Sequence, residues 1–348
     1  MGKIIDYRDL PGGTHNQTTR KITRFSNTGR KLFSVRKESK DVKLQKEIDY
    51  LISLPDNLKI HFPKILAYEK NIPPFFYEME WYDQKTLRRA IFDGDINPEL
   101  SFLIIQKIVF FAIKHIFCYN QSVTDINHLE KTSFSRILDR HSELSKSSVL
   151  KPFLSVETII IEGKSYKNIF IIIKELQERE DIISKLTPKK THMIHGDFHF
   201  DNFLIDTKNS DNFILIDPRR EKRGYDYTYD LGKLWHSFHG LYDFIHEGKF
   251  KLDYTIDEKK FFVSSFGPEI HQAMDTYKYI YQHRQILIDM VTQLLGEKNA
   301  EEQILFSEAV HFCSLAPFHL LNDGIEKGPI CRYLTGVKLI NELFERLR

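Results

Sequence analysis

Three polar residues of this 348-residue chain, Asp197, Asn202 and Asp217, stand at a spacing that could carry chemistry. Asp197 and Asn202 are five positions apart in one loop, and Asp217 directly follows a short apolar run, residues 213–216. A carboxylate that can take a proton from a hydroxyl is thus combined with an amide and a second carboxylate, whose oxygens suit Mg²⁺. Transfer of a phosphoryl group from a nucleotide to a hydroxyl requires this set of groups.

The order of three motifs resembles the aminoglycoside phosphotransferase and choline kinase superfamily. Its members carry H-G-D-x-x-x-x-N, then an apolar strand ending in I-D, and then D-L-A or D-L-G. In this chain the same order is His195 to Asn202, then Ile216 with Asp217, then residues 230–232. The resemblance implies an α+β, bilobal protein-kinase-like fold, with a β-rich N-lobe and a mainly helical C-lobe.

The resemblance also implies roles for the three polar residues. Asp197 is expected to be the catalytic base, and Asn202 and Asp217 are expected to bind Mg²⁺, with ATP as co-substrate. Asp201 is the next candidate if Asp197 is not the base. His195 is expected to hold the catalytic loop by hydrogen bonds rather than to react.

A basic residue that grips the nucleotide phosphates is expected on the strand near residue 36, again by resemblance. Arg36 matches that position, and Glu47 on the following helix is expected to orient it. Lys37 takes the role if the register is shifted by one, because adjacent strand residues face opposite ways.

Further nucleotide contacts are implied by a small, polar turn and by a hinge strand. The turn is expected within residues 12–16, and the backbone of the hinge is expected to bind the adenine edge. The residues concerned are Gly13, Thr14, Asn16, Glu80 and Tyr82.

The apolar pattern predicts the elements that position these groups. Alternation and turn signals in the first 80 residues predict a sheet with one amphipathic helix, whose apolar residues recur at helical spacing. The expected strands are 19–25, 31–37, 65–68 and 75–81, and the expected helix is 44–52. A hairpin is expected at 158–166, and helices alternating with loops are expected after about residue 228. The resulting domains are an N-lobe at 1–78, a hinge at 79–84 and a C-lobe at 85–348.

Composition excludes several classes of protein. With 50 Lys and Arg against 48 Asp and Glu, the formal net charge of +2 argues against nucleic-acid binding through bulk charge. The three cysteines lack zinc-site or disulfide spacing, which fits a reducing compartment. No apolar stretch reaches the ~20 residues of a membrane helix, and the first residues lack a signal sequence. We therefore expect a cytoplasmic protein without membrane insertion, and the sequence leaves its oligomeric state undetermined.

The acceptor is expected to be a small molecule with a hydroxyl group. The run 216–220, with residues 229–237, resembles phosphotransferase domains of bacterial capsule and surface-polysaccharide gene sets, which favours a sugar or sugar-like acceptor. Choline, another amino alcohol or an aminoglycoside is the alternative, and such cations would need acidic C-lobe residues. The available carboxylates are Asp243, Glu247, Asp275 and Asp289.

Three other functions fit the sequence less well. A catalytically silent nucleotide-binding scaffold would not need the complete set of reactive groups. A protein kinase would need an A-P-E motif and an activation segment after Asp217, and neither is present. A metallohydrolase is disfavoured because the spacing of His192, His195 and His199 matches no metal-binding motif.

Overall fold

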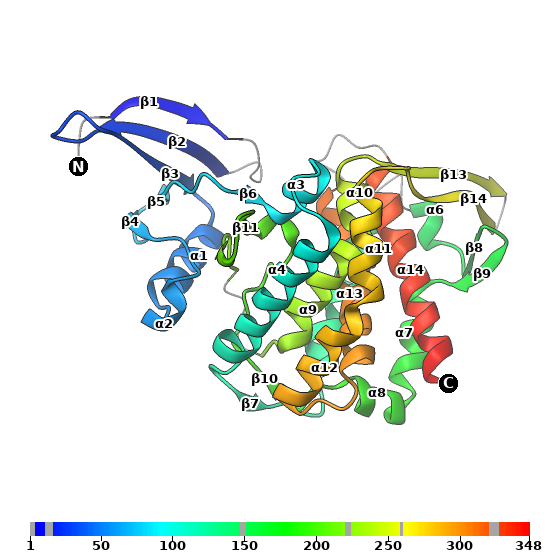
Figure 1. Cartoon of the computed structure of the whole chain (residues 1–348). Coiled ribbons are helices and arrows are strands. Elements are labelled where there is room, and N and C mark those ends of the chain that lie inside the picture. Colours follow the sequence, from blue (N-terminus) through cyan, green and yellow to red (C-terminus); the bar gives the residue numbers. More distant parts are fainter. Residues whose placement is uncertain (1–3, 11–16, 147–150, 220–223, 258–259, 320–326) are drawn as a thin grey trace. The chain divides into compact units, whose positions relative to one another are not determined.

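The computed structural model describes residues 4–10, 17–146, 151–219, 224–257, 260–319 and 327–348 (Figure 1). The chain divides into two compact units, each made from two stretches of sequence. Unit 1 is Met1–Ala90 with His195–Glu221, and unit 2 is Ile91–Ile194 with Lys222–Arg348. The segment that carries Asp197 therefore belongs to the same unit as the strand-rich N-terminal residues. The division into an N-lobe, hinge and C-lobe at 1–78, 79–84 and 85–348 stays a prediction.

Unit 1 contains a five-stranded antiparallel sheet in the order β1-β2-β3-β5-β4. Its strands are β1 (Ile4–Asp9), β2 (Gln17–Phe25), β3 (Lys31–Ser39), β4 (Ile65–Glu69) and β5 (Phe75–Glu80). The four strands expected from the sequence are confirmed. The fifth, β1, is additional to them, and it pairs with β2 along one edge of the sheet.

Local signals explain the helix of this unit. Helix α1 (Val42–Ile52) begins at Asp41, whose carboxylate accepts a hydrogen bond from the Lys43 amide at 2.8 Å. Leu44, Ile48 and Leu51 are buried on one face, as the predicted helical spacing requires. The short helix α2 (Asp56–Lys59) follows Pro55.

A second, three-stranded sheet joins the two stretches of unit 1. Its order is β12-β11-β6, formed by β12 (Asn209–Leu215), β11 (Phe203–Asp206) and β6 (Lys85–Thr86). The Leu215 amide donates to the His61 carbonyl at 2.8 Å, and the His61 ring stacks on Phe213 with centroids 3.9 Å apart. Helix α3 (Leu87–Phe92) then leads from unit 1 into unit 2.

Unit 2 is mainly helical, and its core is formed by buried aliphatic and aromatic side chains from residues 129–344. Helices α13 and α14 lie side by side in it (Figure 1). The helices are α4 (Pro98–Phe111), η1 (Ala112–Ile116), η2 (Glu130–Phe134), α5 (Ser135–Leu144), α6 (Lys151–Leu154), α7 (Ile169–Gln177), α8 (Glu180–Leu186), α9 (Tyr227–Phe238), α10 (Tyr242–His246), α11 (Met274–Gln282), α12 (Arg284–Leu295), α13 (Ala300–His319) and α14 (Gly328–Leu347).

Strands are also present in unit 2, and one hairpin contradicts the sequence-based expectation. The order β13-β14-β8-β9 joins β13 (Phe250–Asp257), β14 (Lys260–Pro268), β8 (Thr158–Ile161) and β9 (Lys164–Lys167). The hairpin of β8 and β9 is confirmed. The expectation of helices and loops alone after residue 228 is wrong, because β14 pairs in parallel with β8, about 100 positions away in the chain. A two-stranded sheet pairs β10 (Lys190–Thr191) with β7 (Ser122–Val123).

The third motif of the sequence, residues 230–232, lies in the first half of α9. Asp230 is fully buried there, and Gly232 faces α13. A Cβ atom on Gly232 would lie 2.7 Å from Ser307 Oγ and 2.9 Å from the Glu308 amide nitrogen. The glycine therefore permits the close approach of two buried helices, a packing role rather than a chemical one.

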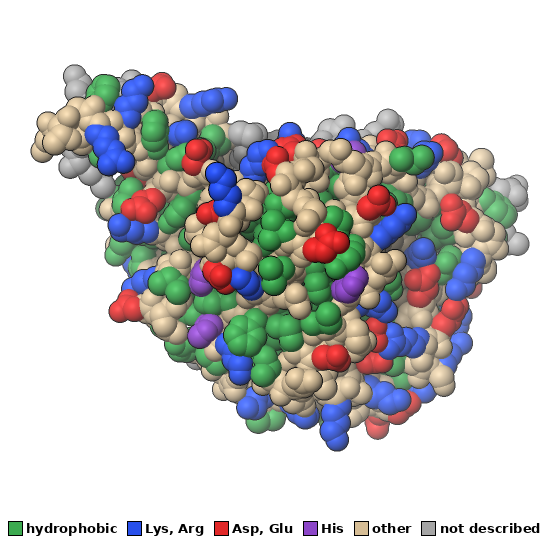
Figure 2. Space-filling model, in the orientation of Figure 1, with side chains coloured by type: hydrophobic (Ala, Val, Ile, Leu, Met, Phe, Trp, Pro, Cys, Tyr) green, Lys and Arg blue, Asp and Glu red, His purple; other side chains and the backbone are tan. Residues whose placement is uncertain are grey.

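The surface is mixed in charge. On the face drawn in Figure 2, Lys and Arg side chains are interspersed with Asp and Glu side chains. In the part of the chain that the structure describes, no helix combines the length and apolar character needed to cross a membrane.

Candidate active site

Lys37 is a buried basic residue on β3, the middle strand of the five-stranded sheet. Its ammonium group lies 2.8 Å from Glu47 Oε1 on α1 and 3.0 Å from Asp217 Oδ1, which follows β12. Tyr77 on β5 donates a further hydrogen bond of 2.6 Å to Glu47. Two carboxylates, one on α1 and one after β12, thus pair with the same cation.

The expected pairing of Arg36 with Glu47 is wrong. Arg36 forms an ion pair with Glu38 at 3.0 Å, and its guanidinium lies 3.6 Å from the ring centre of Phe76. Side chains alternate between the two faces of a strand, so Lys37, the alternative, faces Glu47 while Arg36 faces away. Both residues are basic, so their types in the sequence do not indicate which of them faces Glu47.

Burial and pairing act against each other in this cluster. Burial lowers the pKa of Lys37, but the carboxylates of Asp217 and Glu47 together raise that pKa above its ordinary value. For Glu47 burial dominates, and it raises the pKa although Lys37 opposes the change. Lys37 therefore keeps its positive charge, while Asp217, whose side chain is 42% exposed, stays open to solvent.

A tight backbone arrangement shapes the loop before Asp197. Gly196 adopts a φ of +84°, a conformation that side-chain-bearing residues rarely adopt. The Asp197 amide donates to His195 Nδ1 at 3.3 Å, and the Arg219 amide donates to the His195 carbonyl at 2.7 Å. His195 is fully buried. It holds the loop by hydrogen bonds, as expected.

Asp197 is buried beside a cation. Arg219 Nη2 lies 2.7 Å from Asp197 Oδ2, and His199 Nε2 lies 3.5 Å from Asp197 Oδ1. Only 6% of the Asp197 side chain is exposed, against 59% of Arg219. The sequence carries no signal for the contact between Arg219 and Asp197, because it depends on how two separate segments pack.

Asn202 connects the Asp197 loop to Asp217. The side-chain nitrogen of Asn202 donates to the backbone carbonyl of Asp197 at 2.7 Å. The backbone carbonyl of Asn202 accepts from the Ile216 amide at 3.0 Å. The bond to Asp197 uses the side-chain nitrogen of Asn202, so the side-chain oxygen of Asn202 is the atom suited to a cation. Asp217 has a φ of +56°, which Asp tolerates better than most residues. The backbone of Asn202 is thus bonded to that of Ile216, which precedes Asp217, and the binding of Mg²⁺ by the Asn202 and Asp217 side chains stays a prediction.

The alternative base, Asp201, has other partners. Arg88 Nε lies 2.6 Å from Asp201 Oδ2, and the Thr86 hydroxyl donates to Oδ1 at 3.2 Å. This ion pair and this hydrogen bond connect the loop to α3 and β6, which gives Asp201 a structural role in unit 1.

Of the remaining predicted nucleotide contacts, those at the hinge lie within the described residues and those at the turn do not. The turn with Gly13, Thr14 and Asn16 lies outside the described residues. At the expected hinge, the Glu80 amide donates to the Lys64 carbonyl at 3.1 Å, and the Tyr82 hydroxyl accepts from the Lys64 amide at 3.0 Å.

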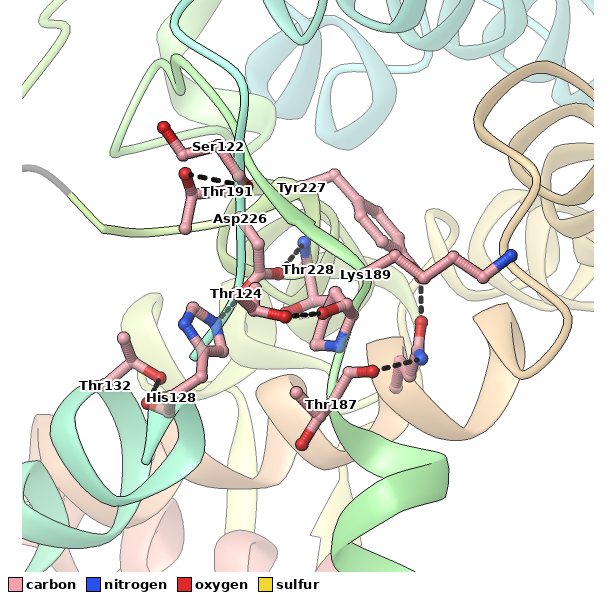
Figure 3. A network of polar contacts seen from close by, with 12 residues as sticks. Ser122, Thr124, His128, Thr132, Thr187, Lys189, Thr191, Asp226, Tyr227 and Thr228 are labelled. Carbon is pink, nitrogen blue, oxygen red and sulfur yellow. Dashed lines mark hydrogen bonds and ion pairs between the residues drawn. The ribbon is translucent and has the colours of Figure 1, made fainter. Parts of the chain in front are cut away.

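A buried polar network in unit 2 surrounds Asp226 (Figure 3). One Asp226 oxygen lies 2.6 Å from His128 Nε2, and the other accepts from the Thr228 amide at 2.8 Å. Asp226 therefore caps α9, and each of its two oxygens has a partner. Among the described residues, no group of three or more His, Cys, Asp or Glu side chains could hold a metal ion.

The C-lobe carboxylates considered for a cationic acceptor differ in their surroundings. Asp243 is fully buried and accepts a hydrogen bond of 2.6 Å from Tyr277. Three others are exposed, on or next to α10, α11 and α12: Glu247, Asp275 and Asp289.

The fold is that of kinase-like phosphotransferases, an α+β bilobal architecture. A thermostable mutant of aminoglycoside phosphotransferase APH(4)-Ia, in ternary complex with AMP-PNP and hygromycin B, matches with a TM-score of 0.53 and 11% sequence identity. The match covers 97% of this chain and 94% of that chain. The crystal structure of APH(4)-Ia matches over the same shares, with a TM-score of 0.51 and 12% identity.

Choline kinase from Cryptosporidium parvum Iowa II is also similar, with a TM-score of 0.49 and 14% identity over 99% of this chain and 90% of that one. No protein-family model and no curated protein matches the sequence. The two APH(4)-Ia matches confirm the expected fold class, at a level of identity that shows the fold alone.

Proposed function

We propose that this protein is a small-molecule kinase that transfers the γ-phosphoryl group of ATP to a hydroxyl of a sugar or sugar-like metabolite. The observation that carries the proposal is the bridge from Lys37 to Glu47 and Asp217, in the same unit as the buried Asp197. A fixed cation for the phosphates and a carboxylate for the hydroxyl are the two groups that this reaction needs most.

Each residue has a distinct role in the proposed reaction. Lys37 binds the nucleotide phosphates, and Asp197 orients the acceptor hydroxyl. The acceptor oxygen forms a bond to the γ-phosphorus, the bond from that phosphorus to the ADP oxygen breaks, and the hydroxyl proton passes to Asp197. Asn202 and Asp217 would hold Mg²⁺, which neutralises phosphate charge when bound.

The donor set supports Mg²⁺ rather than a transition metal. An amide oxygen and a solvent-open carboxylate are hard oxygen ligands, and nucleotide phosphates supply more of the same kind. The motif resemblance to capsule and surface-polysaccharide gene sets supports a sugar acceptor. Choline or aminoglycoside phosphorylation and a silent scaffold remain the alternatives.

The test is Asp197→Asn, which keeps the shape of the side chain and removes its charge. Acceptor phosphorylation, measured by mass spectrometry of the product, should fall by ~10²–10⁴-fold, the range for a positioned general base. Binding of Mg²⁺-ATP should change little, because Asp197 contacts the acceptor. Asp211→Asn, at an exposed carboxylate of the same unit, is the matched control. Unchanged turnover in Asp197→Asn would overturn the proposed role, and wild-type protein without acceptor-dependent turnover would favour the scaffold.

A further inference from the structure

The cation beside Asp197 is fixed by its backbone. The Arg219 amide bonds to the His195 carbonyl at 2.7 Å. The carbonyl oxygen of Arg219 lies so close to Gly196 that a Cβ atom added to Gly196 would approach this oxygen to 2.4 Å. The backbone of Arg219 is therefore packed against the loop that presents Asp197, and the ion pair between the two side chains follows from this packing.

Exposure differs sharply across this ion pair. The Asp197 carboxylate is almost wholly buried, whereas 59% of the Arg219 side chain is accessible. A guanidinium carries five N–H donors in a planar fork, and it can contact a second anion while it pairs with the first. A molecule that places a hydroxyl on Asp197 must therefore approach an accessible positive charge.

Three other carboxylates of the candidate active site, Glu47, Asp201 and Asp217, also have basic partners. Glu47 and Asp217 share Lys37, and Asp201 pairs with Arg88. A cationic acceptor would have to compete with Arg219 for Asp197. An anionic acceptor would instead gain a charge-assisted contact.

We propose that the acceptor carries an anionic group, a phosphate or a carboxylate, and that Arg219 binds this group while Asp197 orients the hydroxyl. The inference rests on the proposed function and deepens it, because it names the charge class of the substrate. It separates this protein from kinases of amino alcohols and aminoglycosides, whose acceptors are cations.

Matched ligands on one sugar ring test the inference. Glucose, its phosphate monoester, glucuronate and glucosamine are titrated calorimetrically into the 348-residue protein with Mg²⁺ and AMP-PNP. Each ligand is also assayed for phosphorylation with ATP. We expect the two anionic ligands to bind at least tenfold more tightly than glucose, and glucosamine to bind most weakly.

Arg219→Gln should weaken binding of the anionic ligands by roughly 10–100-fold, the equivalent of one charge-assisted contact, and should weaken binding of glucose and AMP-PNP by clearly less. Arg219→Lys should restore part of the loss, because it keeps the charge without the planar fork. Arg30→Gln removes an exposed arginine at the β2–β3 turn and is the matched control.

Two results would overturn the inference while leaving the proposed function intact. One is binding of glucose or glucosamine as tight as that of the anionic ligands. The other is a loss of AMP-PNP affinity in Arg219→Gln that equals or exceeds the loss for acceptors, which would assign Arg219 to the nucleotide. A wild-type protein that binds no Mg²⁺-nucleotide would instead refute the proposed function itself.

Discussion

At the scale of single residues, the alternation of one strand decides which cation faces Glu47 and Asp217. Lys37 is 7% exposed and bridges two carboxylates, whereas Arg36 rests on Phe76 and pairs with Glu38. Two adjacent basic residues therefore have different surroundings, and substitution at each should have different consequences.

Replacing Lys37 tests this difference. The double variant Lys37→Met with Glu47→Gln avoids leaving a buried, uncompensated charge, which by itself would destabilise the fold by ~3–5 kcal/mol. Affinity for Mg²⁺-ATP, measured by calorimetry, should fall by about 10–100-fold because a charge-assisted contact is lost. Arg36→Met is the control and should bind ATP like the wild type. Equal losses at both positions would contradict the assignment of Lys37.

At the scale of elements, the loop from His195 to Asp197 and the segment after β12 form one packed structure. It depends on Gly196, where both the positive φ and the nearby Arg219 carbonyl exclude a side chain. Gly29, in the turn between β2 and β3, has a similar φ of +78°, but a Cβ added there would meet no atom within 4 Å. A comparison of substitutions at the two glycines therefore distinguishes the cost of the backbone conformation from the cost of a steric collision, because only Gly196 has both.

Gly196→Ala should lower the free energy of unfolding by more than Gly29→Ala, for which the backbone conformation alone costs about 1–2 kcal/mol. Because the collision displaces Arg219 or the Asp197 loop, Gly196→Ala should also reduce turnover at least tenfold. Urea unfolding and an acceptor assay measure the two effects. Equal stability losses and full activity in both variants would show that the loop tolerates the added methyl group.

Another element-scale prediction concerns His192, which directly precedes the loop and lies in unit 2. Burial lowers the pKa of His192 to about 4, although Asp226 opposes this shift. The unfolded chain, with a pKa of about 6.5, therefore binds more protons than the folded protein between these two values. The free energy of unfolding should fall as the pH drops from about 6.5 to 4, by roughly 2–3 kcal/mol from this residue.

His192→Gln should remove that part of the acid sensitivity, as measured by urea unfolding at pH 7, 5.5 and 4. His115→Gln, at an exposed histidine, is the matched control. If both variants lose stability in acid as steeply as the wild type, His192 is not the group responsible.

At the scale of the whole molecule, each compact unit is built from two separate stretches of chain. Unit 1 needs residues 195–221, because β11 pairs with the two-residue strand β6 and Leu215 bonds to His61. No single cut in the sequence therefore separates unit 1 from unit 2.

A fragment of residues 1–90 should not fold cooperatively by itself, because the partners of β6, His61 and Arg88 are missing. The same fragment joined to residues 195–221 by a Gly-Ser linker should gain a cooperative transition. Circular dichroism during thermal unfolding measures both. A sharp transition in the shorter fragment would show that residues 195–221 are dispensable for unit 1.

The sequence by itself predicted the class of fold through its motif resemblance. It also predicted four of the five strands in the larger sheet of unit 1, because alternation and turn signals are local properties. The motif spacing also predicts that Asn202 and Asp217 act together, and the bond between the Asn202 carbonyl and the Ile216 amide agrees with that prediction. Only the tertiary structure decided between Arg36 and Lys37, because the face of a strand depends on what packs against it. The same holds for β13 and β14, whose pairing with β8 is long-range, and for the ion pair of Arg219 with Asp197, which depends on how two segments pack at Gly196.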